Sequence, residues 1–287
     1  MSAIDLSQFL QHLPRPGERR YEPLGLTLLH SVAAAPPSSV WHEPALVYVL
    51  QGQKCGQLGS QYFEVNAGEW LLIHLPQVMS CDTSQLQGDP FLAMALSIDM
   101  DLVAELILST SSLKDPPAEP ATESTVAAQS AAEQSALARL LDCLASELDQ
   151  QVLGASLRRE LHYRALCSPA GALLRQMAKA GSKAWALWRV VQHMRANLQQ
   201  TRDMSRLAKS AAMSESAFYS AFKRQLGASP LQYLKQMRLQ RARQLMALQG
   251  FGVAQAAFAV GYASASQFSR EYRQWFGHPP SEAAQWL

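Results

Sequence analysis

Residues Ser214–Pro230, SESAFYSAFKRQLGASP, are repeated in pattern fifty residues later as Ser264–Pro280, SASQFSREYRQWFGHPP. Aligning the two serines matches aromatic, basic, glycine and proline positions at one constant offset. The matched pairs are Phe218 with Phe268, Phe222 with Tyr272, Lys223 with Arg273, Leu226 with Phe276, Gly227 with Gly277 and Pro230 with Pro280. One structural unit is therefore expected twice.

Each copy has the features of a short amphipathic helix. A serine suited to an N-cap opens it, aromatic residues four positions apart form one buried stripe, and glycine followed by proline ends it. A second short helix is expected before each copy, over residues 203–211 and 253–260, followed by a tight turn containing Ala212 or Gly261. The small residues Ala208 and Ala257 allow two helices to cross closely. The pattern predicts two helix-turn-helix units, at about 203–224 and 251–274.

The face opposite the aromatic stripe is polar and basic in both copies, which suits a groove in nucleic acid. An ordinary helical bundle is the alternative, although the repeat, the caps and the charge together favour DNA binding. Some of these residues are expected at phosphates, because they flank the groove-facing side chains or lie at a helix N-terminus that attracts anions. They are Ser214, Lys223, Arg224, Ser264 and Arg273.

The charge is distributed unevenly along the 287 residues. The net charge is only +2, but residues 182–287 contain 14 Lys and Arg against 4 Asp and Glu, and the preceding residues contain 11 against 19. A basic C-terminal region provides attraction to phosphates, and an acidic partner region limits indiscriminate binding. The sequence thus predicts two domains of opposite charge.

Two stretches of the C-terminal region resemble the DNA-binding domain of the AraC/XylS family of bacterial transcription regulators. They are LAKSAAMSESAFYSAFKRQLGASPLQYLKQMRLQRARQLM (207–246) and VAQAAFAVGYASASQFSREYRQWFGHPPSE (253–282). The resemblance extends to the subgroup with an AraC-type N-terminal regulatory domain, through LVYVLQG (46–52), AGEWLLIHLP (67–76), RRELHYRAL (158–166) and SPAGALLRQMA (168–178).

The resemblance implies a C-terminal all-α domain in which residues 231–248 form a linker helix between the two units. Matched position by position, it also implies which side chains face base edges: Ser216, Tyr219, Ser220, Ser266, Ser269 and Arg270. Arg270 can bind guanine through two hydrogen bonds at once, whereas Ser and Tyr are more tolerant. Many relatives have a basic residue in place of Ser220, so the first helix is expected to specify bases less sharply.

The N-terminal region reads differently, as short apolar runs separated by turn residues. Residues 1–21 are expected to be an arm with one short helix, and strands are expected between about 24 and 98, with a closing helix at 101–108. Six or more strands at intervals of about ten residues are typical of a sandwich or a small barrel. We predict a cupin-like β-barrel spanning the regulatory domain, residues 1–108.

The next segments are predicted to be a connector and helices. Residues 109–135 are rich in Pro, Ser, Ala and Glu, which indicates a flexible connector. Residues 136–181 are expected to be helical, and the DNA-binding domain is expected to occupy 182–287. In the helical segment, an apolar stripe could form a homodimer contact or pack on its own barrel, and the sequence does not separate the two. The stripe is Leu137, Leu140, Leu141, Leu144 and Leu148.

Candidate ligand contacts in the barrel are aromatic, polar and reactive residues. Trp41 and Trp70 are expected pocket walls, with His42 and Cys55 as polar or reactive contacts. Alternation along residues 61–65 sends Tyr62 and Phe63 to opposite faces, so at most one of them points inward. The cysteines at 55, 81, 143 and 167 lack a metal-binding or disulfide spacing. Oxidant sensing by Cys55 or Cys81 is a minority alternative to structural burial.

We predict a cytoplasmic transcription regulator whose N-terminal domain senses a small molecule or a stress signal. Promoter DNA, RNA polymerase, an unidentified effector and a second copy of the chain are the expected partners. No signal peptide or membrane span is expected. The alternatives are a cupin metalloenzyme with an accessory domain and a constitutive DNA binder whose barrel only dimerises. Cupin metal sites need an H-x-H motif, which is absent, so no catalytic residue, metal or cofactor is expected.

Overall fold

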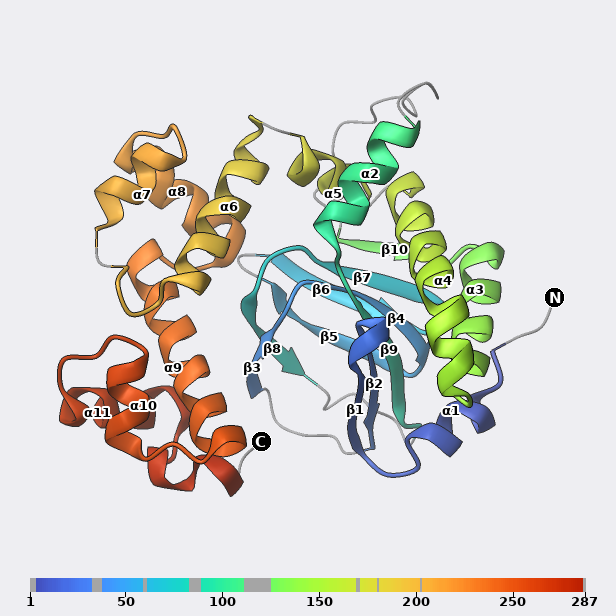
Figure 1. The fold of residues 1–287 in the computed structure, drawn as a ribbon, viewed down its shortest axis with the longest axis horizontal. Helices are drawn as coiled ribbons and strands as arrows, with labels where there is room; N and C mark the ends of the chain where they lie inside the picture. The colour runs from blue at the N-terminus through green and yellow to red at the C-terminus, as the bar shows by residue number, and fades with distance from the viewer. Residues whose placement is uncertain are drawn as a thin grey trace. The chain divides into compact units, whose positions relative to one another are not determined.

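The computed structural model describes residues 4–32, 38–58, 61–82, 89–110, 125–168, 171–179, 181–201 and 203–285. The chain divides into two compact units, residues 1–185 and 186–287 (Figure 1). The first unit contains all the described strands, and the second is helical. None of the described helices is long and apolar enough to cross a membrane.

The first unit contains two antiparallel sheets. The six-stranded sheet has the order β1-β2-β9-β4-β7-β10, and the four-stranded sheet has the order β3-β8-β5-β6. The strands of the larger sheet are β1 (Gly17–Tyr21), β2 (Leu26–Ser31), β4 (Ala45–Gln51), β7 (Glu69–Ile73), β9 (Phe91–Ser97) and β10 (Val126–Ala128). Those of the smaller sheet are β3 (Ser38–His42), β5 (Gln53–Leu58), β6 (Gln61–Asn66) and β8 (Gln77–Asp82).

The larger sheet is covered on both faces, which explains the continuous apolar run in its central strand β4. Val47 and Val49 belong to an interior cluster shared with Phe63 and Val65 of the smaller sheet. The alternate residues Leu46 and Tyr48 belong to a different cluster, formed with the surrounding helices. Successive side chains of a strand point to opposite faces, so a strand buried on both sides must be apolar throughout.

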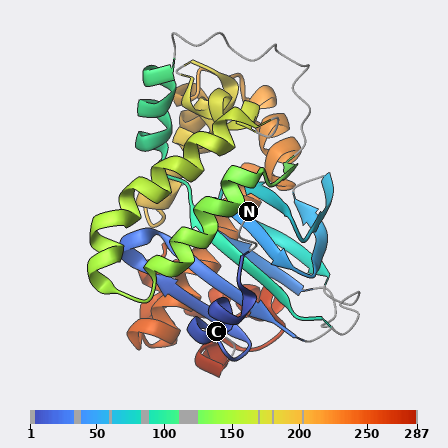
Figure 2. The ribbon, with the colours of Figure 1, turned by 90° about the vertical axis from the view of Figure 1, so that its right-hand side faces the viewer.

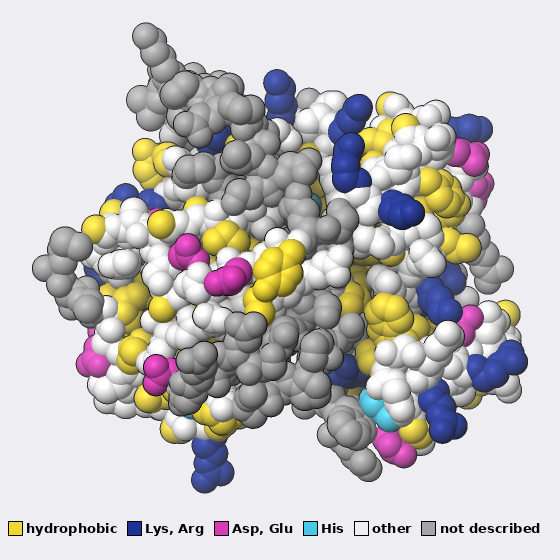
Figure 3. Space-filling model, turned by 180° about the vertical axis from the view of Figure 1, so that it is seen from behind, with side chains coloured by type: hydrophobic (Ala, Val, Ile, Leu, Met, Phe, Trp, Pro, Cys, Tyr) yellow, Lys and Arg dark blue, Asp and Glu magenta, His cyan; other side chains and the backbone are white. Residues whose placement is uncertain are grey.

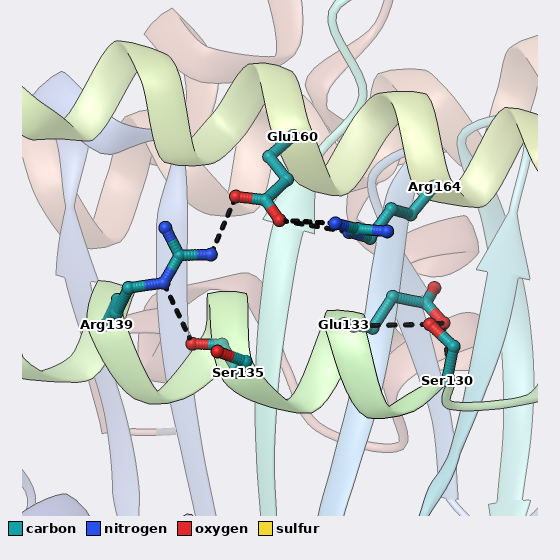
Figure 4. Close-up of polar contacts among 6 residues, drawn as sticks. All are labelled: Ser130, Glu133, Ser135, Arg139, Glu160 and Arg164. Carbon is teal, nitrogen blue, oxygen red and sulfur yellow. Dashed lines mark hydrogen bonds and ion pairs between the residues drawn. The ribbon is translucent and has the colours of Figure 1, made fainter. Parts of the chain in front are cut away.

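The helices of the first unit cover the outer face of the larger sheet (Figure 2). They are α1 (Leu6–His12), η1 (Glu22–Leu24), α2 (Met100–Thr110), α3 (Ala131–Cys143), α4 (Glu147–Cys167) and α5 (Gly171–Ala178). An ion pair links α3 and α4, because Glu160 of α4 accepts a hydrogen bond from Arg139 of α3 at 2.7 Å (Figure 4). Within α4, Arg164 donates to the same carboxylate at 2.8 Å. This helical layer makes the first unit a sandwich with a third, helical layer.

The predicted cupin-like barrel is not observed. Among the described residues, no strand pair joins the two sheets into a closed barrel. Short strands at intervals of about ten residues are equally typical of an open sandwich, so the spacing alone could not decide between the two. The prediction for residues 61–65 is confirmed, because Tyr62 is exposed whereas Phe63 is buried.

Two segments predicted as irregular contain regular structure. Residues 17–21 of the predicted arm form β1, which pairs with β2. The predicted connector at 109–135 includes β10, which pairs with β7, and the beginning of α3. Ser130 and Glu133 form a capping box at that helix start, which fixes the chain there. Residues 111–124 of the connector lie outside the described residues.

The leucine stripe of the helical segment mostly faces its own domain. Leu137, Leu140, Leu141 and Leu144 are buried in the cluster between the helices and the larger sheet. Only Leu148 is exposed, with 68% of its surface accessible. The four buried leucines therefore serve the core of the domain, and a dimer contact cannot rest on them.

The second unit consists of helices connected by tight turns. These helices are α6 (Lys183–Ala196), α7 (Met204–Ser210), α8 (Glu215–Leu226), α9 (Pro230–Gln249), α10 (Val253–Ala259), α11 (Ala265–Phe276) and η2 (Pro280–Gln285). A capping box formed by Ser229 and Gln232 starts α9, and Gly250 ends it in the left-handed conformation. The predicted linker helix is confirmed as α9, which both helix pairs contact.

Candidate nucleic-acid interface

The helices α8 and α11 begin and end in the same way. The hydroxyl oxygen of Ser214 accepts a hydrogen bond from the amide of Ala217, and that of Ser264 accepts one from the amide of Gln267, each at 3.3 Å. Gly227 and Gly277 end the two helices with φ values of 69° and 80°. Glycine adopts this left-handed conformation without steric cost. The predicted caps are therefore confirmed in both copies.

The turns of the two helix-turn-helix units correspond but differ in length. Ala212 in the first turn has φ 53°, and Gly261 in the second has φ 94°. The amide of Met213 bonds to the carbonyl of Ala208 at 3.0 Å, as the amide of Tyr262 bonds to Ala257 at 3.0 Å. These equivalents are 49 residues apart, whereas the N-caps are 50 apart. The second turn therefore has one additional residue before its N-cap.

Aromatic contacts attach α8 to α9 and attach α11 to the turn that precedes it. In the first helix-turn-helix unit, the ring centroids of Phe218 and Phe222 lie 4.8 Å apart, and that of Tyr233 on α9 lies 5.6 Å from that of Phe222. In the second helix-turn-helix unit, the ring centroid of Phe268 lies 5.3 Å from that of Tyr262 and 5.5 Å from that of Tyr272. With the aromatic stripe buried in this way, the opposite face of each helix is left for solvent or DNA.

The residues predicted to contact bases lie on the outer face of α8 or α11. Ser216, Tyr219, Ser220, Ser266 and Arg270 are exposed, and Ser269 is half-buried. The hydroxyl of Ser269 donates a hydrogen bond to the carbonyl of Ala265 at 2.9 Å. Its oxygen can therefore accept from a base more readily than it can donate. The placement of these six side chains is compatible with base contact, which stays a prediction.

The residues predicted to contact phosphates are also on the outer surface. Lys223, Arg224 and Arg273 are exposed near the C-terminal ends of the helices. The capping oxygens of Ser214 and Ser264 accept from the helix backbone, so their hydroxyl protons are available to donate outward. Figure 3 shows Lys and Arg side chains spread over the helices of this unit, with few acidic side chains between them.

A polar network that the sequence reading missed anchors α11. Glu271 accepts hydrogen bonds from the hydroxyl of Tyr262 at 2.8 Å and from the side-chain amide of Gln267 at 3.2 Å. The ammonium of Lys235, on α9, lies 3.2 Å from the same carboxylate. Burial alone would raise the pKa of Glu271, but hydrogen bonds from Tyr262, Gln267 and Lys235 lower it overall. Glu271 is the only acidic residue of α11. A single acidic residue in an otherwise basic helix is the sequence feature that indicates a specific partner for it.

A second set of hydrogen bonds attaches α9 to the segment after α6. The guanidinium of Arg238 donates to the carbonyl of Leu198 at 2.8 Å and to that of Thr201 at 2.8 Å. Carbonyls near the end of a helix otherwise lack partners, so a charged donor is well placed there. The sequence reading did not single out Arg238, because these contacts are far apart along the chain.

The four predicted effector contacts in the first unit do not converge on one site. Trp70 faces the helices, in the cluster that includes Tyr48. His42 lies opposite Gln77 on β8, whereas Trp41 lies opposite Val78 and so points to the other face. Cys55 is buried and lies opposite Glu64 and Asp82, outside the cluster between the sheets.

Two histidines of the first unit are held neutral. Burial, and then the charge of Lys54, lowers the pKa of His42 to about 3. Burial lowers the pKa of His74 to about 4. Among the described residues, no three His, Cys, Asp or Glu side chains are grouped so that they could hold a metal ion. Both imidazoles are therefore neutral at physiological pH.

Two family models match the chain. A model described as AraC-type transcriptional regulator N-terminus matches residues 24–173, and a helix-turn-helix domain model matches residues 207–285. The first match covers more than half of the chain and includes both sheets apart from β1. The second includes α8, α9, α10 and α11.

Named relatives match about a third of the chain. The transcriptional regulator GbdR of Pseudomonas aeruginosa is 33% identical over 105 residues, which are 37% of this chain and 29% of GbdR. The probable transcriptional regulator LumQ of Photobacterium leiognathi is 35% identical over 85 residues, which are 30% of this chain and 34% of LumQ. The chain thus aligns with about a third of the length of these relatives.

Solved structures of ToxT from Vibrio cholerae share the fold over nearly the whole chain. An apo form of ToxT with a single substitution has a TM-score of 0.58 and 12% identity, covering 94% of this chain and all of ToxT. Wild-type ToxT with a bound unsaturated fatty acid has a TM-score of 0.57 and 12% identity, covering 91% of this chain and 95% of ToxT. At this identity the likeness is one of fold.

Proposed function

The chain belongs to the family of AraC-type transcriptional regulators, and from this premise we propose that it binds promoter DNA sequence-specifically through α8 and α11. The observation that carries the proposal is the repeat itself. Two capped helices present exposed polar and basic faces from a single chain, and one continuous helix, α9, contacts both helix pairs. A duplicated face of this kind can read two segments of one DNA site.

The length of α9 suits this mode of binding. At 1.5 Å per residue, its 20 residues span about 30 Å. Helices that enter successive major grooves on one side of B-DNA lie about 34 Å apart. A rigid helix of similar length can hold the two helix-turn-helix units at the spacing of successive major grooves, without a second subunit.

We propose that the first unit is a sensor for a small molecule and does not catalyse a reaction. Its sandwich contains the buried, neutral His74 and other buried polar groups, which can hold a ligand by hydrogen bonds. The structure of ToxT with a bound unsaturated fatty acid supports the proposal, because that protein has a similar fold. An effector changes DNA binding only through its different affinity for two states of the protein.

A homodimer is a further part of the proposal, through the exposed face of α4. Leu148 and Val152 are four residues apart, and Tyr163 follows eleven residues later, so the three lie on one helical face. Their accessible fractions are 68%, 64% and 36%. Burying this face against a second copy would remove apolar surface from water. We propose RNA polymerase as the partner through which DNA-bound protein affects transcription.

The proposal is tested by selecting DNA from a randomised duplex library with the full-length protein. An enriched sequence, whose affinity falls steeply as salt rises, supports specific binding by a basic face. Repeating the selection with small-molecule mixtures tests the sensor function. Sedimentation of the wild type and of Leu148→Asp tests the dimer. Absence of any enriched sequence at low and at moderate salt would refute the proposed DNA recognition.

A further inference from the structure

A group of buried polar atoms lies between the larger sheet and α3, on the face opposite the sandwich interior. The Tyr48 hydroxyl, the Trp70 indole nitrogen and Oε1 of Glu133 have no hydrogen-bond partner among the described residues. The exposed fractions of these residues are 0%, 0% and 2%. Burying a polar atom without a partner is costly, so such groups usually indicate a bound water or a ligand.

Strand pairing brings two of the three residues together. Tyr48 of β4 lies directly opposite Trp70 of β7, and their ring centroids are 6.0 Å apart. Both side chains belong to the cluster facing the helices. On the other side of β7, Ala127 of β10 pairs with Trp70. The two aromatic residues therefore form part of one surface beneath the chain segment that leads into α3.

Glu133 joins this surface from the first turn of α3. Gln129 donates hydrogen bonds to the carbonyls of Val49 and Glu69, at 2.9 Å and 2.7 Å, so the segment before α3 is fixed to β4 and β7. Burial, and then the charge of Glu133, raises the pKa of the Tyr48 hydroxyl. The carboxylate is therefore within electrostatic range of the tyrosine.

The carboxylate of Glu133 has one oxygen engaged and one free. Its Oε2 accepts from the amide and the hydroxyl of Ser130, both at 2.7 Å, as Figure 4 shows. Its Oε1 has no described donor. No Lys or Arg among the described residues makes an ion pair with this carboxylate. The capping contact thus leaves one acceptor oxygen without a donor, within electrostatic range of the Tyr48 hydroxyl, and Tyr48 in turn lies against Trp70.

The three atoms define the chemistry of the group that would satisfy them. Indole N–H can only donate, the tyrosine hydroxyl can donate, and a carboxylate oxygen can only accept. A hydroxyl group provides two acceptor positions and one donor, which matches this set. We propose that Tyr48, Trp70 and Glu133 bind the hydroxyl group of a small alcohol or polyol. This inference rests on the proposed sensor function and specifies the chemical class of effector.

The site is also placed to transmit binding. A ligand whose hydroxyl donates a hydrogen bond to Oε1 of Glu133 stabilises the same carboxylate that closes the capping box of α3. It would also bring β4, β7 and the start of α3 into one hydrogen-bonded group. Occupancy is therefore expected to stabilise β10 and the first turn of α3 together.

The test uses full-length protein and measures thermal unfolding and calorimetric binding with 1-butanol, 1,3-butanediol and glycerol. A saturable rise in Tm with at least one of these probes is expected. Methyl propyl ether is the matched control for 1-butanol, because it has the same atoms but cannot donate to Glu133. Tyr48→Phe should abolish the rise, whereas Tyr62→Phe, which removes an exposed hydroxyl from the same unit, should retain it.

Glu133→Gln provides a second, independent result. Glutamine can still cap α3 through its side-chain oxygen. Its NH2 group then takes the place of Oε1, so the variant presents a hydrogen-bond donor to the ligand instead of an acceptor. The variant should therefore lose its response to 1-butanol and gain one to methyl propyl ether. If Tyr48→Phe does not fold, this exchange of preference still decides the matter.

Two results would overturn the inference. One is the absence of a saturable response to all three hydroxyl probes in the wild type. The other is destabilisation by Tyr48→Phe without any probe response, which would indicate a bound water only. Neither result affects the library selection for DNA. Conversely, a probe response in a protein that selects no DNA sequence would support the site and refute the proposed function.

Discussion

The hydroxyl of Tyr262 donates a 2.8 Å hydrogen bond to Glu271, and so connects the turn of the second helix-turn-helix unit to the helix that follows it. Lys235 of α9 contacts the same carboxylate at 3.2 Å. Turn, α11 and α9 therefore meet at a single acidic residue. Because Glu271 directly follows Arg270 in α11, this network orients the segment that we propose reads DNA bases.

Removing the Glu271 carboxylate should destabilise the second compact unit, residues 186–287. Glu271→Ala leaves the hydroxyl of the buried Tyr262 without its acceptor, which is expected to cost about 1–3 kcal/mol in the free energy of unfolding. Tyr262→Phe combined with Glu271→Ala should cost less than the two single changes added together, because the two groups interact. Thermal unfolding of the fragment 182–287, which we predict folds alone, measures these values. Strict additivity would show that the hydrogen bond contributes nothing.

The same network predicts a pH dependence. The pKa of Glu271 is lowered from an unperturbed value of 4.5, so the unfolded state takes up a proton at a higher pH than the folded state. The stabilisation by this group is complete above about pH 5 and is lost as the pH falls through the folded pKa. The stability difference between wild type and Glu271→Gln should therefore decrease below about pH 4.5. A constant difference from about pH 7 to about pH 3 would contradict this.

The two turns should respond oppositely to exchange of glycine and alanine. A Cβ added at Gly261 would lie 2.8 Å from the backbone of Gln199, and its φ is 94°. Gly261→Ala is therefore expected to destabilise the fragment by about 1–3 kcal/mol or more. Ala212 already occupies the left-handed region, at φ 53°, so Ala212→Gly should be neutral or slightly stabilising. Equal effects in the two turns would show that the close approach at Gly261 is unimportant.

The sequence predicted the second unit well, because its signals are local. N-caps, glycine ends and aromatic stripes lie within single helices, and the repeat supplied an internal check. The sheets depend on pairing between distant segments, such as β4 with β9, which strand spacing does not reveal. The S-x-x-E capping box at Ser130 and Glu133 is a local signal for a helix start, but the surrounding Pro, Ser, Ala and Glu residues favour a flexible connector. Tyr48 and Glu133 were not grouped beforehand, because their proximity depends on the packing of α3 against the sheet.

Lys223→Ala should weaken DNA binding without changing its specificity. Lys223 is exposed near the end of α8, where its charge can neutralise one phosphate. Affinity should fall for all sequences by a similar factor, and the slope of log affinity against log salt should decrease by about one. Fluorescence anisotropy at several salt concentrations, with specific and unrelated duplexes, measures both quantities. Lys183→Ala, on α6 outside both helix-turn-helix units, is the matched control. Loss of discrimination at unchanged general affinity would assign Lys223 a different role.

The most direct test of the account is a library selection performed in parallel with wild-type protein and Arg270→Ala. The account predicts two preferred blocks of bases about 10–10.5 base pairs apart, one for α8 and one for α11. Arg270→Ala should relax the preference at one base pair of the α11 block, at a cost of about 1–3 kcal/mol, and should leave the α8 block unchanged. Identical preferences for both proteins, or a single enriched block in the wild type, would contradict recognition by two helices of one chain.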